Sequence, residues 1–216
     1  MRLMAVSAAF LLLAGGLRAA PDDLTGWRGA RWGMTESQLA EVFGAELRRL
    51  PGRWDFGGAY AEQAFFDVDF AGLGFTAFFQ MNKASGRLQQ VLLERRAIRA
   101  TPAAYDAVLS ALTAAYGPAE ESCVEPHPDG PPRRVSLRWR FPTTTVQVTW
   151  LDFLTTAILF EDPNRDRDPL VPFAETRRIN RRFLPRRLLI RFYPSERRDL
   201  EGWKSCEGKV EGRTAE

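Results

Sequence analysis

The sequence is poor in the residues that most often build catalytic and metal sites. Its 216 residues include one histidine, His127, and two cysteines, Cys123 and Cys206. A hydrolase triad needs a nucleophile, a histidine and a carboxylate held together, and no nucleophile signature surrounds Cys123. His127 lies in the proline-rich segment 126–132, which is typical of a solvated loop. We therefore expect no catalytic residues and no cofactor. A hydrolase that uses Cys123 or His127 remains an alternative.

One spacing resembles a metal site. Oxygen-bearing side chains stand at alternate positions from 162 to 168, as at the start of a calcium loop. The pattern then fails, because Arg167 stands where the loop needs glycine and Phe173 where it needs a bidentate glutamate. We expect an exposed turn and no metal here. The alternating residues are Asp162, Asn164, Asp166 and Asp168.

Long apolar runs are missing after the first twenty residues. Arg2 gives a positive start, residues 3–17 are apolar and small, and Ala19 and Ala20 precede a polar Pro-Asp-Asp segment. This pattern predicts a secretory signal peptide over 1–20, too short for a permanent membrane anchor. Cleavage after Ala19 and after Ala20 both stay open. No cysteine follows the run, so a lipid-anchored amino terminus is not expected. The expected location is periplasmic or secreted.

The two cysteines fit an oxidising compartment. A Cys123–Cys206 disulfide would tie the end of the sequence to its body and restrict the unfolded chain by a few kcal/mol. The alternative is two unpaired thiols, one in each of two loops.

Lysine is scarce, and the positive charge is almost entirely arginine. The formal net charge is +3; residues 163–216 hold 14 Lys and Arg against 9 Asp and Glu, a net of +5, which leaves −2 for residues 1–162. Clustered guanidinium groups favour phosphate and acidic partners, so this segment is a candidate surface for anionic membrane. Nucleic acid is not an expected partner of an exported protein. The arginine pairs are Arg177–Arg178, Arg181–Arg182 and Arg186–Arg187.

Two helix starts organise the rest of the chain. Thr35 and Gln38 form a capping box, and Thr101 followed by Pro102 gives a second helix start. The first helix has an apolar stripe that reaches Leu50, and Gly44 either ends it early or lies inside it. The second helix ends at Gly117-Pro118. The stripes are Leu39, Val42, Phe43, Leu47 and Leu50, then Tyr105, Val108, Leu109, Leu112 and Tyr116.

Three strand patterns follow each helix start. They cover 64–70, 75–81 and 88–95, then 136–141, 145–150 and about 154–160. Apolar and polar residues alternate in most of them, which is typical of an antiparallel meander covered on one side. Trp139 and Trp150 fall in the apolar register, so we expect them in the core. Trp203 is the tryptophan best placed for a contact outside it.

The two halves align with a shift of 66 residues. Thr35 falls on Thr101, Val42 on Val108 and Leu88 on Leu154, which favours an internal duplication over chance agreement. The predicted fold is α+β: two tandem α-βββ repeats, about 28–96 and 97–162, form one antiparallel sheet with two helices on one face. The repeat domain spans 21–162, and an Arg/Pro-rich, partly disordered tail spans 163–216. Within this tail, the apolar residues of 188–193 could form one short strand or a clip onto the body.

The opposite sheet face is the expected binding surface. The pattern places Phe65 and Phe78 on it among polar residues, and lets Asp67 and Asp69 pair with arginines across the sheet, each pair worth a few tenths of a kcal/mol. The candidate binding residues are Phe65, Phe78, Arg138, Arg140, Arg181, Arg182, Arg186 and Arg187.

The segment Gly33-Met34-Thr35, with Leu39 and Phe43-Gly44 after it, resembles the helix start of bacterial outer-membrane assembly lipoproteins of the SmpA/OmlA type. The tandem helix-plus-sheet repeats also look like those of the beta-lactamase inhibitor protein. The resemblance implies a secreted protein that binds other proteins through a sheet face. Two features depart from it: the lipid-carrying cysteine is missing, and Arg99-Ala100-Thr101 replaces Gly-Met-Thr in the second half.

The sequence thus leads to one main hypothesis: a non-enzymatic binding or accessory protein of the bacterial envelope, with a protein partner on the exposed sheet face. Attachment to anionic membrane through the arginine-rich tail is the alternative.

Overall fold

The computed structural model describes residues 21–96, 100–127, 130–152 and 186–200. Several predictions fall outside these residues: the signal peptide, the calcium-like spacing, the strand at 154–160, Arg181 and Arg182, and Cys206 with Trp203.

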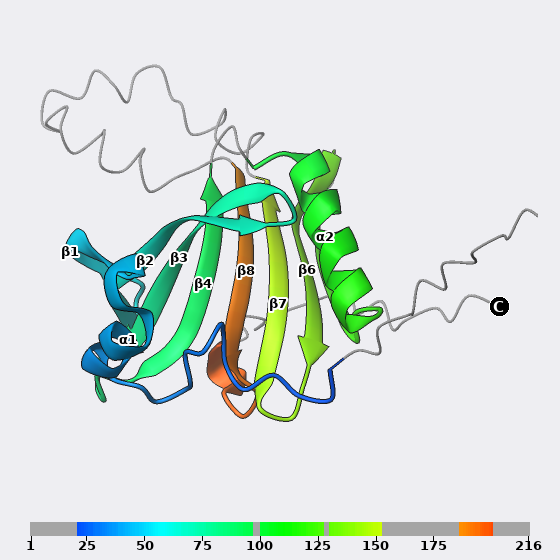
Figure 1. Ribbon diagram of the computed structural model, residues 1–216. Helices are drawn as coiled ribbons and strands as arrows, with labels where there is room; N and C mark the ends of the chain where they lie inside the picture. The colour runs from blue at the N-terminus through cyan, green and yellow to red at the C-terminus, as the bar shows by residue number, and fades with distance from the viewer. Residues whose placement is uncertain (1–20, 97–99, 128–129, 153–185, 201–216) are drawn as a thin grey trace, which may run out of the picture.

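The described residues form one antiparallel sheet with two helices, so the α+β class is confirmed, with eight strands instead of six. The strand order is β1-β2-β3-β4-β8-β7-β6-β5 (Figure 1). Each half is a meander, and the halves join where β4 pairs with β8. The strands are β1 (Arg48–Asp55), β2 (Ala59–Phe70), β3 (Leu73–Asn82), β4 (Leu88–Arg96), β5 (Glu121–His127), β6 (Gly130–Arg140), β7 (Thr144–Asp152) and β8 (Arg186–Pro194).

The central strand β8 comes from the segment that the sequence assigned to the tail. Its apolar side chains are buried on both faces: Ile190 is fully buried among the core residues, while Leu189 packs on the other side of the sheet. A strand buried on both faces has no clean alternation. The sequence allowed one short strand or a clip at 188–193, and the structure has a strand at Arg186–Pro194 in the centre of the sheet.

The two outer strands, β1 and β5, were missed. In β1 only Leu50 is buried, and Pro51 and Gly52 interrupt the apolar spacing where β1 shifts register against β2. Irregular, polar edge strands of this kind resist pairing with other chains, and they leave little periodic signal.

Both helix starts are confirmed. Thr35 caps α1 (Glu36–Phe43) in a capping box with Gln38, and Thr101 caps α2 (Pro102–Tyr116), which has Pro102 in its first turn. Helix α1 ends at Gly44, whose φ of 54° lies in the left-handed region. Leu47 and Leu50 therefore do not extend the α1 stripe, and Leu50 belongs to β1.

Both helices pack on the same face of the sheet. Leu39 of α1 and Val108 and Leu112 of α2 enter one core cluster with the inward side chains of the strands. Trp139 and Trp150 are 2% and 7% exposed in this cluster, as expected. Its centre is aromatic: Trp27 contacts Phe65, Phe79 and Phe192 at ring-centroid distances of 5.8 to 6.2 Å.

The N-terminal segment before α1 runs across the strand ends on the helix side (Figure 1). Asp23 accepts a hydrogen bond of 2.8 Å from the Thr143 amide, and the Trp32 indole donates one of 3.0 Å to Thr144 Oγ1. Gly33 then donates to the Leu88 carbonyl. The segment therefore links the β6–β7 turn to the start of β4.

Candidate functional site

The face of the sheet that bears no described helix is the candidate site, and we call it the helix-free face. Strand registers place its side chains in rows across the sheet. One row runs from Leu92 on β4 through Arg191, Gln147 and Arg138 to Glu121 on β5. The neighbouring row holds Glu94, Leu189, Thr149, Ser136 and Cys123. This face is polar and rich in arginine at the β5–β8 end.

Its polar side chains are almost inaccessible. Gln147, Ser136 and Thr145 are 0% exposed and Arg138 is 1% exposed. The uncovered face of an antiparallel sheet is normally solvated. Among the described residues no helix covers these positions, so their burial needs a cause outside the helices of the fold.

Hydrogen bonds connect this layer from strand to strand. Tyr193 Oη donates to Gln147 Oε1 at 3.0 Å, and the side-chain Nε2 of Gln147 donates to Thr149 Oγ1 at 3.2 Å. Thr149 and Ser136 hydroxyls lie 3.0 Å apart. Buried polar groups are stable only when they are satisfied in this way.

Glu121 joins two of the predicted arginines. Arg138 Nη1 lies 2.6 Å from Glu121 Oε2, and Arg140 Nε lies 2.7 Å from Oε1. Burial alone would raise the pKa of Glu121, but the Arg140 hydrogen bond and the charges of Arg138, Arg140 and Arg198 outweigh it and lower that pKa. The carboxylate therefore stays ionised at neutral pH and holds both guanidinium groups.

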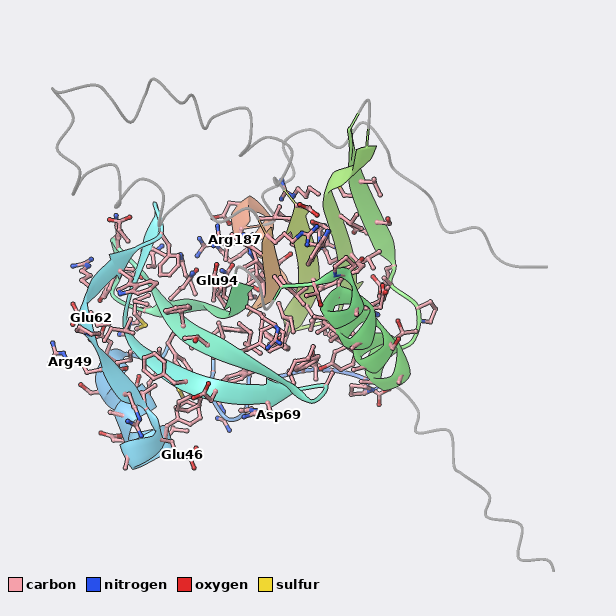
Figure 2. The ribbon with its side chains drawn as sticks, turned by 90° about the horizontal axis from the view of Figure 1, so that it is seen from above. Glu46, Arg49, Glu62, Asp69, Glu94 and Arg187 are labelled. Carbon is pink, nitrogen blue, oxygen red and sulfur yellow. The ribbon has the colours of Figure 1, made fainter. Side chains whose placement is uncertain are left out.

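Two other predicted arginines are also ion-paired. Arg187 Nη2 lies 2.6 Å from Glu94 Oε1, and Arg186 Nε lies 2.9 Å from Asp152 Oδ2. Figure 2 shows Glu94 and Arg187 facing each other near the middle of the sheet. The Glu94 side chain is fully buried, and a buried carboxylate requires such a partner.

Arg191 lies on β8, as Arg187 does, and in the row of Gln147 and Arg138. Its Nε is buried and has no hydrogen-bond partner. Burial lowers the pKa of Arg191 to about 10, and the nearby charge of Arg134 contributes in the same direction. The side chain remains cationic at neutral pH.

At the β1–β4 end the helix-free face turns apolar and contains a pocket of about 320 Å³. Trp54 stacks on Phe78 there with ring centroids 5.1 Å apart. Trp54 and Phe66 line the pocket although they are 38% and 47% exposed. The lining consists of Leu50, Trp54, Phe66, Asp67, Gly74, Phe75, Thr76, Phe78, Glu94 and Arg95.

Phe65 and Phe78, which the sequence predicted on the same face, lie on opposite faces of the sheet. Phe65 is not on the helix-free face: it is 7% exposed in the helix-side core, and its ring lies 5.0 Å from that of Phe43. Strand β2 shifts register between Phe65 and Val68, and Asp67 adopts a φ of 56°. Such a bulge reverses the alternation along the strand. Phe78 lies on the helix-free face as predicted, but it is 3% exposed.

The pairing of Asp67 and Asp69 with Arg138 and Arg140, which the sequence allowed, does not form. The aspartates belong to β2 and the arginines to β6, in opposite halves of the strand order. The two arginines bind Glu121 instead.

Sequence reasoning missed Trp54, Phe66, Glu94 and Arg191. Trp54 was placed beside the end of the first helix and not on this face, because its strand was not recognised. Phe66 was assigned to the buried side because the bulge in β2 has no sequence signature of its own.

The two residues of the hydrolase alternative, Cys123 and His127, lie on the same strand. Cys123 is 5% exposed, and His127 follows it by four residues on β5, which separates their Cα atoms by about 13 Å. That distance gives no support to a Cys–His catalytic pair. In the described part of the chain no three His, Cys, Asp or Glu residues are placed to hold a metal ion.

Within the same described ranges, no helix has the length and apolar character needed to cross a membrane. Compared with protein-family models, with curated proteins and with solved structures, the chain shows no significant match.

Proposed function

We propose that this chain is an exported, non-enzymatic binding protein of the bacterial envelope, and that it holds a protein partner at the pocket end of the helix-free face. The observation that carries the proposal is the pair of exposed aromatic side chains, Trp54 and Phe66, at an apolar pocket. Large aromatic residues are the usual anchors of protein interfaces, and the energy of binding concentrates in them.

The pocket sets the chemistry of the partner. A volume of about 320 Å³ lies at the small end of the range for ligand pockets and suits one or two apolar side chains. Asp67, Glu94 and Arg95 stand in the same lining, so polar groups of both signs flank the apolar floor. The partner is therefore a protein segment that inserts an apolar side chain between polar neighbours.

Peptide display against the immobilised full chain tests the proposal. We expect selected peptides to share an apolar residue at one fixed position. Phe66→Ala should weaken their binding by about tenfold or more, because loss of an anchor costs about 2 kcal/mol. Val42→Ala is the matched control, since Val42 on α1 has the same 47% exposure but does not line the pocket. Equal effects of the two substitutions would refute the site.

We also infer that the two halves arose by duplication. Each half consists of one helix and then four strands, Thr35 and Thr101 cap the two helices, and the strand order of the second half mirrors the first. By position in the sheet the counterpart of β4 is β8, not the segment 154–160. The offset is 66 residues at the caps and 98 residues at the last strand, from Leu88 to Arg186.

Attachment to anionic membrane has weaker support. It needs arginines that are available to phosphate, whereas Arg186 and Arg187 are bonded to Asp152 and Glu94. Arg181 and Arg182 lie outside the described residues.

A further inference from the structure

We propose that residues 201–216 cross the arginine-rich end of the helix-free face and are held there by a Cys123–Cys206 disulfide. The inference does not rest on the proposed function. It concerns the β5–β8 end of the face, whereas the aromatic pocket lies at the β1–β4 end.

The first argument is the place of Cys123. It pairs in register with Ser136 on β6, in the row that also holds Thr149 and Leu189. Its side chain is therefore on the helix-free face, where it is 5% exposed. The sequence contains one other cysteine, Cys206, so an intramolecular disulfide brings residue 206 onto this face. A disulfide-bonded oxidant of an oxidising compartment would accept the two electrons and two protons that the thiols lose.

The second argument is the path of the chain after β8. The Ser195 and Thr145 hydroxyls lie 2.9 Å apart, and Arg197 Nη2 donates to Gln89 Oε1 at 3.3 Å. Thr145 lies on the helix-free face, in the row of Arg140 and Tyr193. The chain therefore leaves β8 on this face at Ser195. The charge of Arg198, three residues on, also helps to lower the pKa of Glu121 on β5.

The third argument is reach. Leu200 and Cys206 are six residues apart, which spans up to about 20 Å in extended chain. Cys123 follows Glu121 by two residues, about 7 Å along β5. A disulfide also allows its two Cα atoms to stand about 5.5 Å apart. From Ser195, Cys123 lies three strand spacings across the sheet and six residues along it, about 14 Å and about 20 Å, so the eleven residues from Ser195 to Cys206 are long enough to reach it.

The fourth argument is burial and charge. Arg138, Gln147 and Ser136 are at most 1% exposed on a face without a described helix, so a further layer is needed there. Residues 201–216 carry four glutamates against two lysines and one arginine. The described side chains of the face carry five arginines, at 134, 138, 140, 187 and 191, against Glu94 and Glu121. The segment and the face are thus complementary in sign.

Arginine labelling with phenylglyoxal, read by mass spectrometry, tests the inference on the full oxidised chain. Peptide mapping without reductant should find Cys123 linked to Cys206. Arg31, which is exposed, should react at least tenfold faster than Arg138. A chain that stops at Leu200 should label Arg138 at least fivefold faster than wild type, with Arg31 unchanged.

Cys206→Ser, with Ser205→Ala as the matched control, tests the covalent part and covers the case in which the shortened chain does not fold. Cys206→Ser should raise Arg138 labelling, and reduction of the wild type should do the same, while Ser205→Ala should not. The inference fails if Cys123 and Cys206 are both alkylated in the unreduced protein, or if Arg138 labelling is the same in all folded variants. Neither result would bear on the Phe66→Ala binding test.

Discussion

At the scale of single residues, the most demanding feature is the burial of arginine on the helix-free face. Arg138 has a 1% exposed side chain and depends on Glu121 for one short ion pair. A buried cation that loses its counter-charge is strongly destabilising, whereas an exposed ion pair contributes little. The two types of pair occur in the same sheet, which makes a matched comparison possible.

We expect Glu121→Gln to lower the free energy of unfolding by about 1–3 kcal/mol. The matched control is Glu62→Gln, because Glu62 pairs with Arg49, whose side chain is 81% exposed. That change should stay within about 0.5 kcal/mol. Denaturant unfolding measures both changes. Equal losses would mean that the buried Arg138–Glu121 pair contributes no more stability than the exposed Arg49–Glu62 pair.

A second prediction at this scale concerns acid. Hydrogen bonds from Thr143 hold the pKa of Asp23 below its usual value of 3.8. A carboxyl with a lowered pKa adds stability above the unfolded value, and this contribution is lost as the pH falls through the folded value. Asp23→Asn should therefore lower the thermal midpoint at pH 7, and the difference from wild type should shrink as the pH falls below 3.8. A difference that persists at low pH would exclude this linkage.

At the scale of elements, local capping chemistry decides where the helices begin. The Thr101 hydroxyl accepts a hydrogen bond of 3.1 Å from the Ala104 amide. Thr101→Ala should cost about 1 kcal/mol, measured by denaturant unfolding. Thr113→Ala is the control inside the same helix, since Thr113 is exposed and alanine is the better helix former; it should cost nothing. A loss at Thr113 equal to that at Thr101 would contradict the assignment of the cap.

The helices and strands also show how much of the fold could be predicted from the sequence. Helix caps and one-sided strands depend on neighbouring residues only, so Thr35, Thr101 and the alternation of β3, β6 and β7 were predictable. The bulge that reverses β2 at Asp67 and the polar edge strands β1 and β5 depend on partners far along the chain. The pocket was unpredictable for the same reason, because it joins Trp54 of β1 with Phe66, Phe78 and Glu94 of three other strands.

At the scale of the whole molecule, β8 makes the two halves one sheet, because it pairs with β4 on one side and β7 on the other. It buries five large side chains, each worth about 1.5–3 kcal/mol. Their sum, about 7–15 kcal/mol before the opposing loss of chain entropy, is as large as the net stability of an ordinary domain. The five are Leu188, Leu189, Ile190, Phe192 and Tyr193.

A chain that stops at residue 185 should therefore not fold, whereas a chain that stops at Leu200 should keep the sheet. Circular dichroism and thermal unfolding of the two lengths check this. A cooperative transition in the shorter chain would mean that the halves are independent domains.

The central position of β8 also governs the timing of folding. Its partner β4 is synthesised about ninety residues earlier, and contacts over such a separation form slowly. During synthesis the sheet cannot be completed until β8, its central strand, emerges from the ribosome. For an exported chain, as proposed above, this delay would let the precursor reach the translocation machinery before it closes into its final shape.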